Sequence, residues 1–420
     1  MRINKVVFFA SAFLILAFVF FGAVFTETAN AAMTDVQAFM STYFGWFYAA
    51  AMSFFLGFAV WLLFSKYGHI RLGKPDEQPE YPYATWISML FSAGIGIALL
   101  FFGVSEPMLY FTNPPNADPG TIEAAKDAMA QTYLHWGFHG WALYVIVGLS
   151  LSFFAYRKDL PLTFRSTLHP LLGDKIFGLP GDIVEVLAVF ATMFGVATSL
   201  GLGIMHVNAG LERMGVMEVT LTNQLILIAA ITIMATISVV SGLDRGIRRL
   251  SEINFSLGIL LMSFVFLAGP SLFLLDSFVE SYGHYLQNIV HLSFDNQAYD
   301  PEATTYSGWT FFYWGWWIAW SPFVGMFIAR ISRGRTIREF ILGVMLVPST
   351  FIILWMTIFG NTGIWMELYG GGGGMAASVE QNMFEPFYVL LDNLPLSSMT
   401  AVVATISGTI YFVTSSDSAS

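Results

Sequence analysis

Residues 313–322 read Tyr-Trp-Gly-Trp-Trp-Ile-Ala-Trp-Ser-Pro, in the middle of an apolar run over 309–329. An α-helix needs about 20 consecutive apolar residues to cross a bilayer, and this run has that length. Nine other apolar runs lie along the chain, at 6–26, 43–64, 84–112, 133–155, 182–205, 221–241, 250–275, 338–360 and 396–416. We therefore expect an all-α polytopic membrane protein with ten transmembrane helices and no soluble domain between them.

The composition supports a membrane protein and excludes several classes of function. Hydrophobic residues make up 56% of the 420 residues and charged residues only 11%, with a mean hydropathy of +0.66. A soluble globular chain has about 25% charged residues, so this chain is too apolar for a soluble enzyme, a disordered protein or a nucleic-acid binder. The absence of cysteine excludes a disulfide scaffold, a cysteine nucleophile and a thiolate metal site.

The lysines and arginines predict the orientation, because basic residues concentrate in cytoplasmic loops. With a cytoplasmic N-terminus and alternating spans, 16 of the 18 basic residues fall on the inner side, and only Lys126 and Arg213 fall outside. This partition predicts a multi-pass protein of a bacterial inner membrane. A cleaved signal peptide ending near Ala29-Asn30-Ala31 is the alternative for the first span, but its apolar run exceeds the usual signal core.

Two spans contain helix-breaking residues. Gly94 and Gly96 interrupt the third span near the expected midplane, and Pro322 interrupts the eighth. The two sites lie five spans apart on helices that run in opposite directions, which predicts an inverted repeat of five helices. Close helix packing at the glycine pair is the alternative.

Aromatic residues gather in the fourth and eighth spans at depths that an interfacial belt does not explain. Indole and phenol faces attract cations, and a box of rings suits a quaternary ammonium group, which cannot donate hydrogen bonds. We therefore expect a substrate cage, with bulky core packing as the alternative. The two aromatic stretches are Trp136–Tyr144 and Tyr313–Trp320, and Trp141 and Tyr144 share one helix face.

Other polar residues give weaker signals. His135 and His139 have the spacing of a two-histidine metal site on one helix face, but no third ligand follows, so we expect no transition metal. Glu106, before Pro107, is interpreted as a cap or gate near the outer surface. No nucleophile triad, phosphate loop or cofactor fingerprint is found, so we expect a protein that is not an enzyme and has no organic cofactor.

Four motifs resemble the betaine/choline/carnitine transporter family over essentially the whole chain. They lie at Ser92–Pro107, His135–Tyr144, Ala197–Gly203 and, most specifically, Tyr313–Glu339. The resemblance implies a LeuT-like fold, with two leading helices (1–82), a first five-helix repeat (83–275), and a connector with a partial second repeat (276–420), all in one membrane domain. It also implies a homotrimer. The family continues for two helices beyond Ser420, so we expect ten of twelve helices here, and no transport by these 420 residues alone.

The resemblance implies secondary active import of a quaternary-ammonium compatible solute for osmoprotection. By motif, the resemblance implies that the ammonium group is held by Trp136, Trp141, Tyr144 and Trp317. Trp314, Trp316 and Trp320 would lie nearby, with Trp320 on the route to the inside. Ala98 stands where many members have a third glycine, a position that tracks substrate preference, so glycine betaine and choline both stay open. A passive channel and a sodium-independent exchanger are less favoured alternatives.

Sodium is the expected coupling ion, because neutral oxygen ligands suit it. The carbonyls of Ala93, Gly94 and Ile95 and the hydroxyls of Thr414 and Ser415 are the candidate ligands, and the resemblance adds the Tyr411 carbonyl. Hydroxyls bonded back to their own helix are the alternative. Protons carried by Asp417 or Glu106 could drive uptake instead. A second sodium site is not expected, because Thr192 is followed four residues later by Val196.

Overall fold

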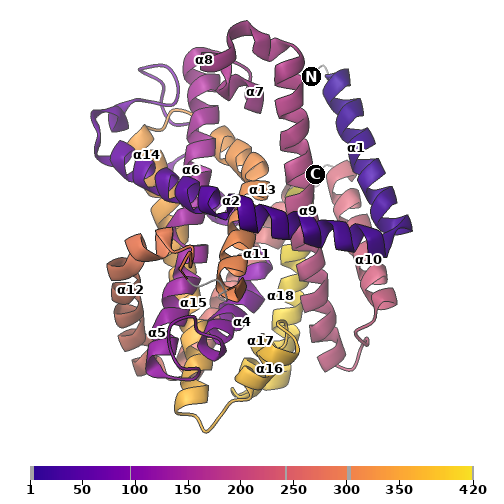
Figure 1. Cartoon of the computed structure of the whole chain (residues 1–420), viewed down its shortest axis with the longest axis vertical. Coiled ribbons are helices and arrows are strands. Elements are labelled where there is room, and N and C mark those ends of the chain that lie inside the picture. Colours follow the sequence, from indigo (N-terminus) through magenta and orange to yellow (C-terminus); the bar gives the residue numbers. More distant parts are fainter. Residues whose placement is uncertain (1–3, 95, 242–243, 300–303, 419–420) are drawn as a thin grey trace. The chain divides into compact units, whose positions relative to one another are not determined.

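The computed structural model describes residues 4–94, 96–241, 244–299 and 304–418, and not the side chains of 91–94, 238–241, 244–252, 304–307 and 412–418. These residues form helices and no strand (Figure 1). The long helices are α1 (Lys5–Val24), α2 (Thr26–Phe64), α3 (Tyr83–Gly94), α4 (Ala98–Thr112), α5 (Ile122–Trp136), α6 (Phe138–Ser152), α9 (Leu179–Arg213), α10 (Leu221–Ser241), α11 (Asp244–Ala268), α12 (Ser271–Phe294), α13 (Thr304–Ile331), α15 (Val347–Leu368) and α18 (Ser397–Ser418). The short helices are α7 (Phe164–Thr167), α8 (His169–Leu172), α14 (Ile337–Ile341), α16 (Met375–Gln381) and α17 (Pro386–Asp392).

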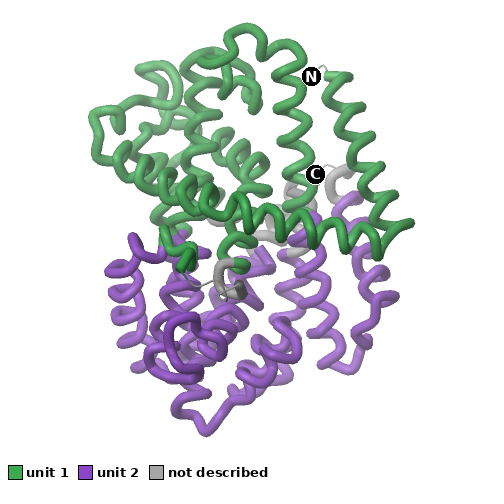
Figure 2. The backbone as a smooth tube through the Cα atoms, viewed as in Figure 1, with its two compact units in different colours: residues 1–90, 138–196, 293–348 green, residues 91–137, 197–292, 349–420 purple. Residues whose placement is uncertain are grey.

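The chain divides into two compact units, coloured green and purple in Figure 2. Unit 1 comprises residues 1–90, 138–196 and 293–348, and unit 2 comprises residues 91–137, 197–292 and 349–420. Both units take segments from each of the two predicted repeats. The division into inverted repeats therefore stays a prediction.

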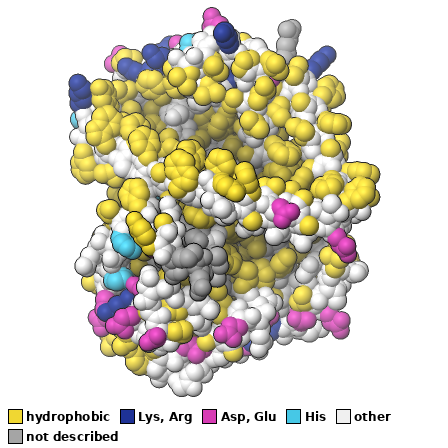
Figure 3. All heavy atoms as spheres, viewed as in Figure 1, with side chains coloured by type: hydrophobic (Ala, Val, Ile, Leu, Met, Phe, Trp, Pro, Cys, Tyr) yellow, Lys and Arg dark blue, Asp and Glu magenta, His cyan; other side chains and the backbone are white. Residues whose placement is uncertain are grey.

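The helices have the length and surface of a polytopic membrane protein. On length and composition, the described residues contain five helices that could cross a membrane, or six if the bent pair α11–α12 is one span. The predicted count of ten is not confirmed. Large apolar side chains such as Phe13, Phe64 and Leu267 are exposed, and Figure 3 shows hydrophobic side chains over much of the visible face. Such a surface suits lipid rather than water.

Several predicted boundaries are wrong. Helix α2 begins at Thr26 rather than near residue 43 and runs for 39 residues. The span predicted over 250–275 ends at Ala268, and α12 follows at an angle of 108°. Gly269 and Pro270 explain this bend, because proline lacks the N–H that would continue the helix. The span predicted over 133–155 is divided at Gly137 into α5 and α6, although no break was expected there.

The third predicted span is interrupted where Gly94 and Gly96 indicated. Helix α3 ends at Gly94, and α4 begins at Ala98 with turns in which Leu99 and Leu100 donate to the carbonyls of Gly96 and Ile97. The last carbonyls of a helix have no partner within it. Backbone oxygens near Ala93 and Gly94 are therefore free of their own helix, while Ile95 lies outside the described residues.

The predicted break at Pro322 is wrong, because α13 is helical from Thr304 to Ile331. Proline removes the N–H that would bond to the Ile318 carbonyl, and the Ser321 hydroxyl donates to that carbonyl at 2.8 Å. A neighbouring hydroxyl of this kind allows a membrane helix to tolerate proline. The inverted repeat therefore has no support from a second broken helix at this position.

Replacing Ser321 with alanine is expected to destabilise α13 by about 1 kcal/mol, because it leaves the part-buried Ile318 carbonyl without its donor. Thermal unfolding of the purified protein in detergent measures this. The control is Ser88→Ala, which removes a bond to Ala84, whose carbonyl keeps its ordinary helical partner. Equal unfolding temperatures for the two variants would contradict this account of Pro322.

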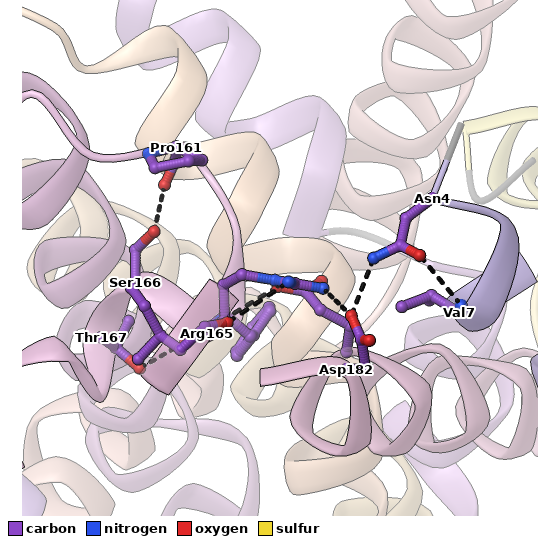
Figure 4. Close-up of polar contacts among 10 residues, drawn as sticks. Asn4, Val7, Pro161, Arg165, Ser166, Thr167 and Asp182 are labelled. Atoms are coloured by element: carbon purple, nitrogen blue, oxygen red, sulfur yellow. Dashed lines mark hydrogen bonds and ion pairs between the residues drawn. The ribbon is translucent and has the colours of Figure 1, made fainter. Parts of the chain in front are cut away.

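Charged side chains hold the connectors of unit 1. Arg165 donates to the Asp182 carboxylate at 2.8 Å and to Glu185 at 3.4 Å, at the start of α9, and Asn4 donates to Asp182 (Figure 4). Carboxylates at a helix N-terminus also interact favourably with the helix dipole. These contacts tie the beginning of α1 and the connector before α9 to one end of that helix.

A second anchor in unit 1 holds the start of α3. Arg335 is buried, donates to the Tyr81 carbonyl at 2.7 Å, and lies over the rings of Tyr83 and Trp86. Burial lowers the pKa of Arg335 from its usual value, although guanidinium groups in proteins keep their charge. The Trp86 indole donates to the Ser332 hydroxyl at 3.0 Å. The start of α3 is thus fixed to the turn between α13 and α14.

Candidate functional site

Helices α6 and α13 of unit 1 bring three predicted cage residues together. Trp141 and Tyr144 lie one turn apart on α6, with ring centroids 5.6 Å apart. The Trp317 ring of α13 lies 6.2 Å from Trp141 and 5.2 Å from Tyr144. All three side chains are buried. The structure therefore joins rings from two helices that are about 175 residues apart in sequence.

Gly140 allows the two helices to approach closely enough for this cluster. A Cβ atom at position 140 would lie 2.7 Å from the Trp317 ring, a separation that real side chains do not adopt. Glycine has no side chain there, so the indole packs directly on the α6 backbone. Trp317 is therefore held against α6 by packing rather than by its position on α13 alone.

The chemistry of the cluster suits a cation. The ring pairs are tilted or edge-to-face, at 59–86°, so faces and edges of different rings meet in one place. A cation within about 6 Å of such ring centroids is attracted by the ring quadrupoles. The Trp141 Nε1 atom is buried and has no hydrogen-bond partner among the described residues, so it offers a donor to a ligand oxygen.

The other tryptophans of α13 contact further rings of unit 1. Trp314 is 5.6 Å from the His139 ring, Trp316 contacts Phe312 at 5.6 Å, and Trp320 contacts Phe323 at 5.6 Å. Trp320 also lies beside Gly195 of α9. Successive positions on a helix point in different directions, and the predicted roles of Trp316 and Trp320 stay predictions.

Trp136 ends α5 in unit 2, and its place in the cage stays a prediction. Its Nε1 atom donates to Glu106 Oε2 at 2.5 Å, and its ring lies 5.6 Å from Phe102. The helix break at Gly137 separates Trp136 from Trp141. The prediction of a single helix over 133–155 did not include this break. The signal was present in the sequence as Gly137 and Gly140, two glycines within four residues.

The helix break at Gly137 also separates His135 from His139, the two histidines whose spacing resembled a metal site. His135 on α5 contacts Glu106 and Gln131, whereas His139 on α6 contacts Ser293 at 2.8 Å, so the two rings do not share one helix face. Within the described residues, no group of three histidine or carboxylate side chains could hold a metal ion. Glu106 is buried and lies inside α4, so it does not cap this helix, and its role as a gate stays a prediction.

The predicted sodium ligands occupy two segments of unit 2. Ala93 and Gly94 end α3, and Tyr411, Thr414 and Ser415 lie on one face of α18, at positions i, i+3 and i+4. The side chains of Thr414 and Ser415 and all of Ile95 lie outside the described residues. Ala98 is buried at the start of α4. The sodium assignment therefore stays a prediction.

Elsewhere, Thr192 donates back to the Ala188 carbonyl at 2.9 Å. This bond occupies the hydroxyl hydrogen within its own helix. The hydroxyl oxygen keeps its lone pairs, so the expectation that α9 provides no second sodium site stays a prediction.

Comparison with known proteins gives a family match over residues 6–420, to the model described as "BCCT, betaine/carnitine/choline family transporter". The chain is 42% identical over 417 residues to a glycine betaine transporter of Acinetobacter baylyi, covering 99% of this chain and 63% of that protein. It is 42% identical over 420 residues to the high-affinity choline transport protein of Escherichia coli, covering 99% and 61%. It is 43% identical over 405 residues to the glycine betaine transporter OpuD of Bacillus subtilis, covering 96% and 78%. The chain thus spans about three fifths of the first two proteins.

Proposed function

Because the chain belongs to the betaine/carnitine/choline transporter family, we propose that it is part or all of a secondary transporter that imports a quaternary-ammonium compound. The family consists of transporters and not of enzymes, in agreement with the expectation from the sequence. The substrate is glycine betaine, choline or a similar compatible solute, the classes that the names of its relatives give.

The buried cluster of Trp141, Tyr144 and Trp317 is the observation that carries this proposal. A trimethylammonium group has a diffuse positive charge and no N–H, so ring faces replace water around it at a low desolvation cost. The Trp141 indole N–H would donate to the carboxylate of betaine or the hydroxyl of choline. Trp316 and Trp320, on α13 of unit 1, would line the path to the cage.

Sodium coupling is the preferred energy source within this proposal. The end of α3 has carbonyls that are free of their own helix, and α18 presents Tyr411, Thr414 and Ser415 on one face. Neutral oxygens of this kind suit Na⁺, which enters as a co-transported ion. Proton-coupled choline import is the second candidate, and the buried Glu106 is the observation that favours it.

The proposed arrangement of the protein covers its fold, its oligomeric state and its membrane location. It comprises a LeuT-like fold with two leading helices and inverted five-helix repeats, a homotrimer, and a bacterial inner-membrane location with a cytoplasmic N-terminus. The concentration of basic residues in the predicted inner loops supports this orientation.

Uptake of radiolabelled betaine, choline and carnitine into proteoliposomes containing the full-length protein tests the function. Accumulation of betaine or choline above the external concentration under an inward sodium gradient is the expected result. Protein-free liposomes are the control. Equal flux with no ion gradient would indicate a channel, and no uptake of any onium compound would contradict the proposal.

A further inference from the structure

The connector between α6 and α9 in unit 1 has large apolar side chains on its surface. It contains α7, α8 and the 3-10 turn Gly173–Phe177. Leu171, on α8, is 82% exposed and Phe177, at the end of the turn, is 55% exposed, whereas the neighbouring Ile176 is fully buried. Single exposed apolar residues need no explanation, but a contiguous apolar surface marks a site of interaction.

The two exposed side chains continue the lipid-facing stripe of α9. Leu179, Ile183 and Leu187 are exposed at positions i, i+4 and i+8, on one face of a helix long and apolar enough to cross a membrane. The stripe begins at the first residue of α9, two residues after Phe177. The apolar surface therefore extends beyond the membrane-spanning helix into the connector.

A contact at the start of α1 gives the depth of this end of unit 1. Helix α1 has 20 residues, a length that matches the hydrocarbon layer of about 30 Å at about 1.5 Å per residue. Its first residue, Lys5, therefore lies at the boundary between lipid tails and headgroups. Asn4 donates to Asp182 at 2.8 Å, so the first turn of α9 lies at the same level (Figure 4).

The connector is folded against this first turn of α9. The Ile176 carbonyl accepts from Arg165 Nη1 at 3.3 Å, and a Cβ atom on Gly181 would overlap that carbonyl. Phe177 follows Ile176 directly, and α8 packs against the turn that contains them. Phe177 and the exposed face of α8 are therefore held near the headgroup boundary.

Basic side chains accompany the apolar surface. Lys175 lies between the two exposed apolar residues in sequence, and Lys5 is exposed at the start of α1. Figure 3 shows lysine and arginine side chains at this end of unit 1. A lysine can lay its stem along apolar groups while its ammonium group reaches a lipid phosphate. The exposed charged residues of the connector are Arg157, Lys158, Asp159, Asp174 and Lys175.

We propose that Leu171, Lys175 and Phe177 form a membrane-docking patch whose partner is the phospholipid headgroup layer. Leu171 and Phe177 enter this layer, and Lys175 faces its phosphates. Amphipathic segments of this kind lie in the plane of the interface, with their apolar side about 5–10 Å deep. The patch anchors to the lipid surface the end of unit 1 at which α1 and α9 begin. It does not depend on which substrate or ion is transported.

Spin labels on single cysteines test the patch, because the 420 residues contain no cysteine. Leu171→Cys and Phe177→Cys are made in the full-length protein, with any cysteine outside these residues replaced by serine. The labelled protein is placed in vesicles of phosphatidylethanolamine and phosphatidylglycerol. Electron paramagnetic resonance then compares collisions with oxygen, which dissolves in lipid, and with a nickel chelate, which stays in water. Both labels should favour oxygen, at a depth of about 5–10 Å.

Two control positions calibrate the measurement. Leu187→Cys, two turns farther along the α9 stripe, should lie deeper in the lipid, and Asp76→Cys, in the exposed connector between α2 and α3, should favour the chelate. Circular dichroism confirms that each labelled variant keeps its helical fold. Labels at 171 and 177 that meet the chelate as readily as the label at 76 would overturn the proposal. Labels that neither reagent reaches would indicate a protein partner and would overturn it as well.

A charge reversal tests the contact with phosphate. Lys175→Glu, combined with Phe177→Cys, should move the label toward water, because a carboxylate is repelled by lipid phosphates. Lys175→Arg in the same background keeps the charge and should keep the depth. An unchanged depth in Lys175→Glu would exclude Lys175 from the patch.

Discussion

Replacing Trp317 with leucine is expected to weaken substrate affinity about 5- to 30-fold. Leucine keeps apolar bulk beside Gly140 but removes the indole face next to Trp141 and Tyr144. One aromatic ring face that contacts a cation in a desolvated site contributes about 1–2 kcal/mol to the binding free energy. A change of about 1.4 kcal/mol corresponds to a tenfold change in affinity. The measurement is the Michaelis constant for betaine and choline uptake in proteoliposomes.

Matched variants make the cage prediction specific. Gly140→Ala should also weaken affinity, because its Cβ would displace the Trp317 ring, whereas Gly315→Ala, on the same helix as Trp317, meets nothing within 4 Å. Trp46→Leu removes an exposed tryptophan of α2 and should leave uptake unchanged. If Trp317→Leu transports with the wild-type Michaelis constant, the cage is misassigned.

The double variant Thr414→Ala/Ser415→Ala is expected to lower sodium affinity about 100-fold. Two hydroxyl oxygens facing a cation contribute about 3 kcal/mol together, on the scale of hydrogen bonds to charged groups. Substrate uptake should then respond little to an imposed sodium gradient. The measurement is the dependence of uptake on external sodium, with a proton gradient imposed in a separate experiment.

The control for the sodium site is Thr409→Ala, on the same helix. Its hydroxyl donates back to the Thr405 carbonyl at 2.8 Å, and Thr409 is not one of the proposed sodium ligands. Sodium dependence should be unchanged in this variant. Unaltered sodium dependence in the double variant, or uptake that follows protons and ignores sodium, would exclude the proposed ligands.

The cage illustrates what sequence patterns can and cannot predict. The spacing of Trp141 and Tyr144 placed them on one face of a helix, and the structure confirms that they are adjacent. The choice of Trp317 among the tryptophans of the eighth span came from the family resemblance. Only the packing of α6 on α13 at Gly140 shows that the Trp317 ring lies beside Trp141 and Tyr144.

The predictions of helix breaks were only partly correct, because a single residue does not determine where a helix ends. Gly94 and Gly96 coincide with the end of α3, but Pro322 lies inside a continuous helix because Ser321 bonds the carbonyl that proline leaves unpaired. Gly137 divides α5 from α6 although it lies in an apolar run without proline. The outcome depends on which neighbouring groups satisfy the backbone.

The sequence by itself determined the membrane class and the family, because these follow from composition, apolar length and motifs. The tertiary structure alone decided where helices break, that Trp317 packs beside Trp141 and Tyr144, and that Glu106 meets His135 and Trp136 across two helices. These last features join residues about 30 positions apart. Such contacts arise from packing and from the need to satisfy buried polar groups, neither of which a local pattern contains.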